Sequence, residues 1–206
     1  MLLFQRKTSH WRTLVRYGKQ DALEYLQAQN TEPQQHTIMS GTGNRNFRWT
    51  RPPQGWMKCN FNAGNANSNA GWIIRDSNGV FKGCGYARND KPTSALEGEL
   101  QALIVAMQST WRRGYRKIIF EGDCKQLVDL MNKDSLHFGL YNWLVEAWFW
   151  KTKFEEARIA WVPREANRVA DKLAKQNIPS SSMFTFLSFP PSCISDVLHS
   201  DQVSSF

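Results

Sequence analysis

The chain has 206 residues, 41% of them hydrophobic, and a net charge of +8. This is enough apolar material for one domain with a real core and excludes a disordered chain, while the basic balance favours a polyanionic partner such as nucleic acid. No apolar run approaches the ~20 residues of a membrane span, and Met1-Leu-Leu-Phe is too short for a signal peptide. We therefore expect an intracellular protein, nuclear or cytoplasmic, that does not enter a membrane and is a monomer.

The two ends of the chain differ in composition from its middle. Residues 1–30 are a basic segment with a possible amphipathic helix, and residues 31–54, rich in Gln, Gly and Asn, are typical of a linker. We expect the folded domain to span residues 55–177. The Ser/Pro/Phe-rich tail, residues 178–206, should be loosely attached.

The first half of this domain predicts three antiparallel strands. Residues 56–62 alternate between apolar and polar side chains, and residues 70–75 and 80–86 flank the hairpin turn at Asn78-Gly79. A long helix should follow from residue 94 to residue 113, because leucines recur there at spacings of three and four.

The second half alternates strands with helices. We expect strands at residues 117–120 and 158–162, with helices at 125–132, 140–154 and 165–176. The tryptophans of the 140–154 helix stand at packing spacing, so they should belong to the core. This order predicts an α/β fold with a five-stranded mixed sheet, three antiparallel strands followed by parallel ones, flanked by helices.

Three acidic residues lie where such a fold can gather chemistry. Asp123 follows a predicted buried strand, and the carboxyl ends of strands in open α/β sheets are common ligand sites; it could equally be only a helix cap. Glu99 lies in the first turn of the long helix, where a solvated glutamate is also favoured. Asp171 shares a helix face with Asn167, four residues before it.

Three motifs carry a resemblance to a known family. They are Leu96-Glu-Gly-Glu-Leu-Gln-Ala-Leu, Ile119-Phe-Glu-Gly-Asp-Cys-Lys-Gln-Leu-Val and Val162-Pro-Arg-Glu-Ala-Asn-Arg-Val-Ala-Asp-Lys-Leu-Ala. In this order they resemble the ribonuclease H domain, in the branch of plant retroelement-derived, reverse-transcriptase-like proteins. The segments around Trp49-x-x-Pro-Pro and Gly71-Trp-Ile-Ile-Arg-Asp resemble that branch as well, so the likeness spans about residues 49–177.

The resemblance implies a ribonuclease H-like fold and hydrolysis of the RNA strand of an RNA–DNA hybrid. The family uses two divalent ions, Mg²⁺ or Mn²⁺, held by four carboxylates. Matched by motif, three of these metal-binding, catalytic residues are Glu99, Asp123 and Asp171. Arg164 stands where the family often has a basic residue or His near the leaving group.

The fourth position of the pattern is degenerate in this sequence. The family ends its first strand in Asn-x-Asp, whereas this chain reads Asn60-Phe-Asn62. A neutral amide at Asn62 removes one negative charge from a cluster that must hold two dications, so we expect metal to bind weakly and activity to be reduced.

Three functions therefore remain open from the sequence. The chain could be a weakened ribonuclease H-type endonuclease, a catalytically inactive module that binds RNA or hybrid, or a retroelement relic. Hybrid or another nucleic acid is the expected partner in the first two cases. The candidate nucleic-acid-binding residues are Asn65, Asn67 and Asn69 in the first hairpin turn, with Lys125 and Gln126 after Asp123; each could also be an ordinary solvated surface residue.

Overall fold

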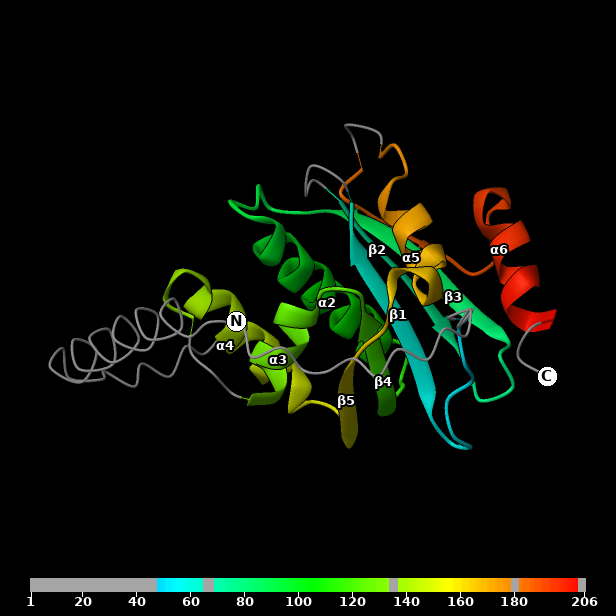
Figure 1. The fold of residues 1–206 in the computed structure, drawn as a ribbon, viewed down its shortest axis with the longest axis horizontal. Coiled ribbons are helices and arrows are strands. Elements are labelled where there is room, and N and C mark those ends of the chain that lie inside the picture. The colour runs from blue at the N-terminus through cyan, green and yellow to red at the C-terminus, as the bar shows by residue number, and fades with distance from the viewer. Residues whose placement is uncertain (1–47, 65–68, 134–136, 179–181, 204–206) are drawn as a thin grey trace, which may run out of the picture.

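One mixed sheet organises the computed structural model, which describes residues 48–64, 69–133, 137–178 and 182–203 (Figure 1). Its strand order is β5-β4-β1-β2-β3-β6. The strands are β1 (Met57–Ala63), β2 (Asn69–Arg75), β3 (Phe81–Arg88), β4 (Lys117–Gly122), β5 (Glu156–Trp161) and β6 (Phe184–Leu187). Strands β1, β2, β3 and β6 pair antiparallel, whereas β4 pairs parallel with both β1 and β5. The predicted α/β fold is thus confirmed.

Helices cover both faces of this sheet. They are α2 (Ala95–Arg112), α3 (Lys125–Lys133), α4 (Tyr141–Lys151), α5 (Arg168–Ala174) and α6 (Ser192–Val203), with single 3-10 turns η2 (Phe138–Leu140) and η3 (Arg164–Ala166). Helices α2, α3 and α4 lie on one side, and α5 and α6 lie on the other (Figure 1). Leu144 and Ala147 of α4 are buried, and its tryptophans pack against the main core, as expected. Within the described ranges, no helix is long and apolar enough to cross a membrane.

The sheet has a sixth strand where the sequence predicted five. Strand β6 comes from the Ser/Pro/Phe-rich segment 178–206 and pairs with β3, and α6 of the same segment buries Ile194, Val197 and Leu198 in a second apolar cluster. A strand of four residues is too short for its alternation to be recognised in the sequence. It forms a strand at the edge of the sheet by pairing with β3, which lies far from it in the sequence.

The segment before β1 also packs on the sheet. Trp49 is 2% exposed and donates its indole N–H to the side-chain oxygen of Asn60 on β1, at 2.9 Å. The guanidinium of Arg75 on β2 lies 3.7 Å from the centre of the Trp49 ring and also donates to Asn60. The packed part of the chain therefore extends at least to Trp49, before the expected start of the domain at residue 55.

A buried ionic network crosses this face of the sheet. Lys58 contacts Glu121 of β4 at 2.6 Å, and Glu121 also accepts a hydrogen bond from the Asn60 amide at 3.1 Å. Arg75, only 1% exposed, pairs with Asp201 of α6 at 2.7 Å. Because a buried charge is costly unless it is paired, the Arg75–Asp201 contact ties α6 to the sheet.

Candidate active site

The site begins with a close approach of α5 to the sheet. A side chain on Gly71 of β2 would place its Cβ only 2.2 Å from the backbone nitrogen of Ala174, so only glycine fits there. The small Ala170 and Ala174 complete this contact on the helix side. The contact brings Asp171 of α5 against Asn62 of β1, whose amide nitrogen donates to an Asp171 carboxylate oxygen at 3.1 Å.

Helix α2 supplies the second acidic side chain. Ser94 caps the helix through the Glu97 backbone N–H, and the Glu97 carboxylate accepts hydrogen bonds from Thr93 and from Gln101. Glu97 is therefore a structural part of the helix start. Glu99 instead points toward the end of β1, where it accepts a hydrogen bond from the backbone N–H of Ala63 at 3.2 Å.

Asp123 follows directly after β4, at the start of α3. It is close enough to Glu99 and Asp171 for their charges to interact, and it shares a hydrogen bond with the side chain of Asn167. Asn167 also donates to the carbonyl of Phe61 at 2.9 Å. One buried amide thus joins β1, α5 and the residue that follows β4.

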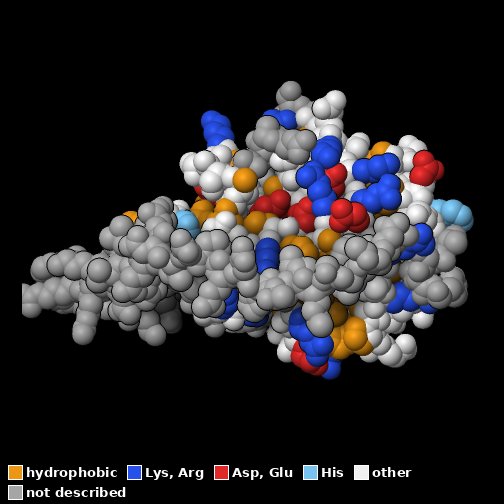
Figure 2. Space-filling model, viewed as in Figure 1, with side chains coloured by type: hydrophobic (Ala, Val, Ile, Leu, Met, Phe, Trp, Pro, Cys, Tyr) orange, Lys and Arg blue, Asp and Glu red, His pale blue; other side chains and the backbone are white. Residues whose placement is uncertain are grey.

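Two cations sit on the Asp171 carboxylate. Lys175, one turn further along the chain, contacts one oxygen at 2.6 Å, and Arg164 contacts the other at 3.3 Å. The second of these oxygens is also the one that accepts the Asn62 hydrogen bond. On the face drawn in Figure 2, acidic side chains lie beside lysine and arginine side chains between α2 and α5.

Burial and neighbouring charges shift the pKa values of Glu99 and Asp123. Burial raises the pKa of Glu99 to about 8, and the charges of Asp123 and Asp171 add to the shift, while the Ala63 N–H opposes it. Burial also raises the pKa of Asp123, with Asp171 adding to the effect and Arg164 opposing it. The Glu99 carboxyl is therefore harder to ionise than an exposed glutamate.

The arrangement departs from a centre of four ionised carboxylates. Carboxylate oxygens are the ligands that Mg²⁺ prefers, but both oxygens of Asp171 contact cations, and burial raises the pKa of Glu99. Asn62 turns a donor N–H, not a charged oxygen, toward Asp171. Within the part of the chain that the structure describes, no group of three or more His, Cys, Asp or Glu side chains could hold a metal ion.

The expected nucleic-acid-binding residues fall into three groups. Asn65 and Asn67 lie outside the described residues. Asn69 uses its amide to donate to the carbonyl of Gln176 at 3.0 Å, so it fastens the chain after α5 to β2. Lys125 and Gln126 are exposed at the start of α3, next to Asp123.

Sequence reasoning did not single out two residues at this site. Lys175 could have been found, because Asp171 and Lys175 are four apart on a helix and such pairs meet. Trp161, at the end of β5, donates its indole N–H to the Asp123 carbonyl at 3.1 Å and leaves its ring 46% exposed beside the site. The sequence pattern of β5 could not predict this contact, because its partner, Asp123, follows a different strand, β4.

The fold is that of a ribonuclease H-like domain. A family model described as reverse transcriptase-like matches residues 57–177, which is more than half of the chain. The chain therefore belongs to the reverse transcriptase-like family of ribonuclease H domains.

Two kinds of relative agree with this assignment. A protein of Arabidopsis thaliana, named as a ribonuclease H protein, is 27% identical over 168 residues; these cover 78% of this chain but only 27% of the relative. Ribonuclease H1 of the halophilic archaeon Halobacterium salinarum superimposes with a TM-score of 0.53 at 25% identity, covering 58% of this chain and 94% of that one. LC11 ribonuclease H1, solved in complex with RNA/DNA hybrid, has the same fold, with a TM-score of 0.51 at 19% identity over 57% of this chain and 92% of that one.

Proposed function

We propose that the chain is a ribonuclease H-type domain that binds RNA–DNA hybrid, and that its hydrolysis of the RNA strand is weakened by Asn62. The observation that carries this proposal is the hydrogen bond from Asn62 to Asp171 at 3.1 Å. It puts a neutral donor where the family has its first metal-binding carboxylate. The other three carboxylate positions are filled by Glu99, Asp123 and Asp171.

The charges around Asp171 support weak metal binding. Glu99, Asp123 and Asp171 are the proposed catalytic and metal-binding residues, and Arg164 is the proposed cation near the leaving group. In this chain, however, Arg164 and Lys175 already neutralise Asp171. A Mg²⁺ or Mn²⁺ ion would have to displace them to use that carboxylate, and it would meet a neutral amide at Asn62. Mutating residues that only hydrogen-bond to metal ligands already costs about 10–100-fold in metal affinity or activity. The loss of a ligand carboxylate itself should cost at least that.

Binding of nucleic acid does not need the missing carboxylate. Phosphate contacts supply most of the affinity, and the RNA strand is recognised through its 2′-hydroxyls by polar groups. The exposed Lys125 and Gln126 are placed to contribute such contacts beside Asp123. This favours an inactive binding module as the second candidate function, ahead of a relic without a role.

The decisive experiment is cleavage of a labelled RNA–DNA hybrid with and without Mg²⁺, by the wild-type chain and by Asn62→Asp. The substitution restores ligand and charge together while barely changing the packing. We expect cleavage to increase by at least about 10–100-fold, and Mg²⁺ to raise the melting temperature of the variant more than that of the wild type.

The matched control is the double variant Asn62→Asp, Asp123→Asn. It keeps the new carboxylate but removes the one after β4, so any cleavage that persists comes from a contaminating nuclease. If Asn62→Asp gains neither cleavage nor stabilisation by Mg²⁺, the weakened-enzyme function is refuted. If the chain then binds hybrid more tightly than duplex DNA, the inactive binding module is supported. If it binds both equally, the retroelement relic is supported.

A further inference from the structure

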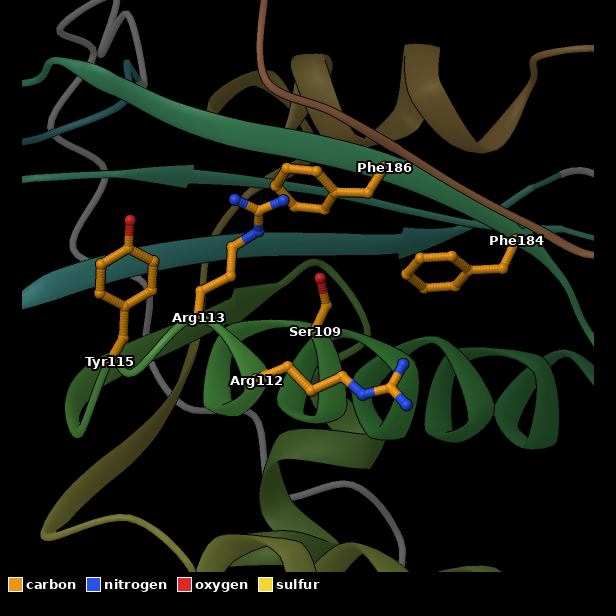
Figure 3. A pocket seen from close by; sticks show the side chains of 6 residues that line it. All are labelled: Ser109, Arg112, Arg113, Tyr115, Phe184 and Phe186. Carbon is orange, nitrogen blue, oxygen red and sulfur yellow. The ribbon is translucent and has the colours of Figure 1, made fainter.

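A cavity opens at the other end of α2, between that helix and the edge of the sheet (Figure 3). It has a volume of about 410 Å³, within the ~300–1,000 Å³ of small-molecule sites. Its lining residues are Ser109, Arg112, Arg113, Tyr115, Phe184 and Phe186. Because Phe184 and Phe186 belong to β6, the cavity exists only where the segment after residue 177, outside the family match, completes the sheet.

The charge of the cavity is positive. None of its lining side chains is acidic, and in the described parts of the chain neither Arg112 nor Arg113 forms an ion pair. The C-terminal end of α2 already has another cation. Arg116 donates to the carbonyl of Trp111 at 2.9 Å and offsets the partial negative charge of that helix end. Two exposed guanidinium groups are thus available for an anion, and guanidinium matches phosphate in a bidentate way.

The rest of the cavity wall is aromatic. Phe184 is 45% exposed although its ring lies only 5.3 Å from that of the buried Trp72. Phe186 lies beneath the guanidinium of Arg113, whose centre is 3.1 Å from the centre of the ring. The Ser109 hydroxyl is fixed by the indole N–H of Trp72 at 3.0 Å. An exposed ring that packs against a buried one offers a stacking surface for a planar group.

We propose that this cavity binds a nucleotide, with its base against the Phe184 ring and its phosphate on the guanidinium of Arg112, which lies on the Phe184 side of the cavity, while Arg113 stays stacked on Phe186 (Figure 3). Phosphate and base are the two groups that call for guanidinium and aromatic partners together. An acidic peptide would use the arginines but not the ring. Glu99 lies about 15–20 Å along α2 from the cavity residues Ser109 and Arg112, at ~1.5 Å per residue. This inference is therefore independent of the proposed function.

The nucleotide can come from two sources, a free mononucleotide or one unit of a single strand. The experiment measures binding to the full chain of AMP by calorimetry and of a short labelled RNA strand by fluorescence anisotropy. Arg112→Gln should weaken binding by at least about tenfold, because hydrogen bonds to charged groups are the strong ones. Arg113→Gln should weaken binding less, because the Arg113 guanidinium stacks on Phe186. Lys133→Gln removes the same charge from an exposed residue outside the cavity and should change affinity less than twofold.

Phe184→Leu tests the stacking surface separately. It should weaken AMP by about fivefold or more while leaving inorganic phosphate unaffected; Phe189→Leu, at a ring that is 83% exposed outside the cavity, should change neither. Loss of AMP binding in the arginine variants identifies a free nucleotide, and loss of RNA binding alone identifies a strand. If neither ligand is weakened, or if Lys133→Gln weakens both equally, the proposal is wrong. All these variants keep Asn62 and Asp171, so the outcome is separate from that of the cleavage assay.

Discussion

Replacing Glu99 with glutamine should change how the stability of the protein depends on pH. Burial beside Asp123 and Asp171 raises the pKa of Glu99 from 4.5 to about 8. Between pH 4.5 and about pH 8, Glu99 keeps its proton in the folded state and releases it in the unfolded state. The stability that this proton contributes is complete below pH 4.5 and is lost as the pH rises through about 8. Glutamine mimics the protonated form at every pH.

The size of the effect follows from the shift. A rise from 4.5 to about 8 is 3.5 units, which at ~1.36 kcal/mol per unit gives a ceiling of about 5 kcal/mol. Part of the shift comes from neighbouring charges that the substitution also changes, so the change assigned to Glu99 alone should be about 2–4 kcal/mol. Urea unfolding at several pH values should therefore give equal stabilities for wild type and Glu99→Gln near pH 4. Near pH 9 the variant should be more stable by about that amount.

Glu165→Gln is the matched control, since it makes the same chemical change at an exposed glutamate on η3. Its difference from wild type should not vary with pH. Should the curves of wild type and Glu99→Gln run parallel from pH 5 to pH 9, Glu99 would not be buried among other acids and the site as described would be wrong.

Three further substitutions or truncations test the packing around the site. Gly71→Ala should destabilise by about 3 kcal/mol in urea unfolding, because its Cβ would lie 2.2 Å from the backbone of α5. Asp201→Asn leaves the buried Arg75 without that carboxylate and should cost about 3 kcal/mol in the same assay; adding Arg75→Met should recover part of the loss. A chain ending at Asn177 should keep the circular dichroism of the folded domain but unfold at lower urea, since it lacks β6 and α6. An unchanged midpoint would show that the tail adds no stability.

The elements from β1 to α5 could be predicted because each carries its own pattern. Helix α2 shows leucines on one face, and β4 is a short run of apolar residues before an acid. The buried charges could not be predicted in this way. Lys58 and Arg75 lie at strand positions that alternate with apolar residues, which is also the pattern of solvent-facing side chains. Their partners Glu121 and Asp201 are far away in sequence, so only the folded chain reveals the pairing.

The sequence could name the residues of a candidate site but not its charge state. The resemblance pointed to Glu99, Asp123 and Asp171; in the structure the charges of Asp123 and Asp171 act on Glu99, and Asn62 donates to Asp171. It could not show that Lys175 and Arg164 hold Asp171, because the direction of a long cationic side chain depends on what it meets.

This charge state has a consequence for how the site meets a phosphate backbone. Its ionisable groups are Glu99, Asp123, Asp171, Arg164 and Lys175. The raised pKa of Glu99 favours its neutral form, and Arg164 and Lys175 offset the charge of Asp171, so phosphate can approach without a divalent ion to screen the acids. Hybrid binding by the wild-type chain should therefore be indifferent to Mg²⁺ at constant ionic strength. Asn62→Asp adds one negative charge, and its hybrid binding should come to require Mg²⁺. A wild-type affinity that falls about tenfold or more on removal of Mg²⁺ would show that the two cations do not replace the metal in this site.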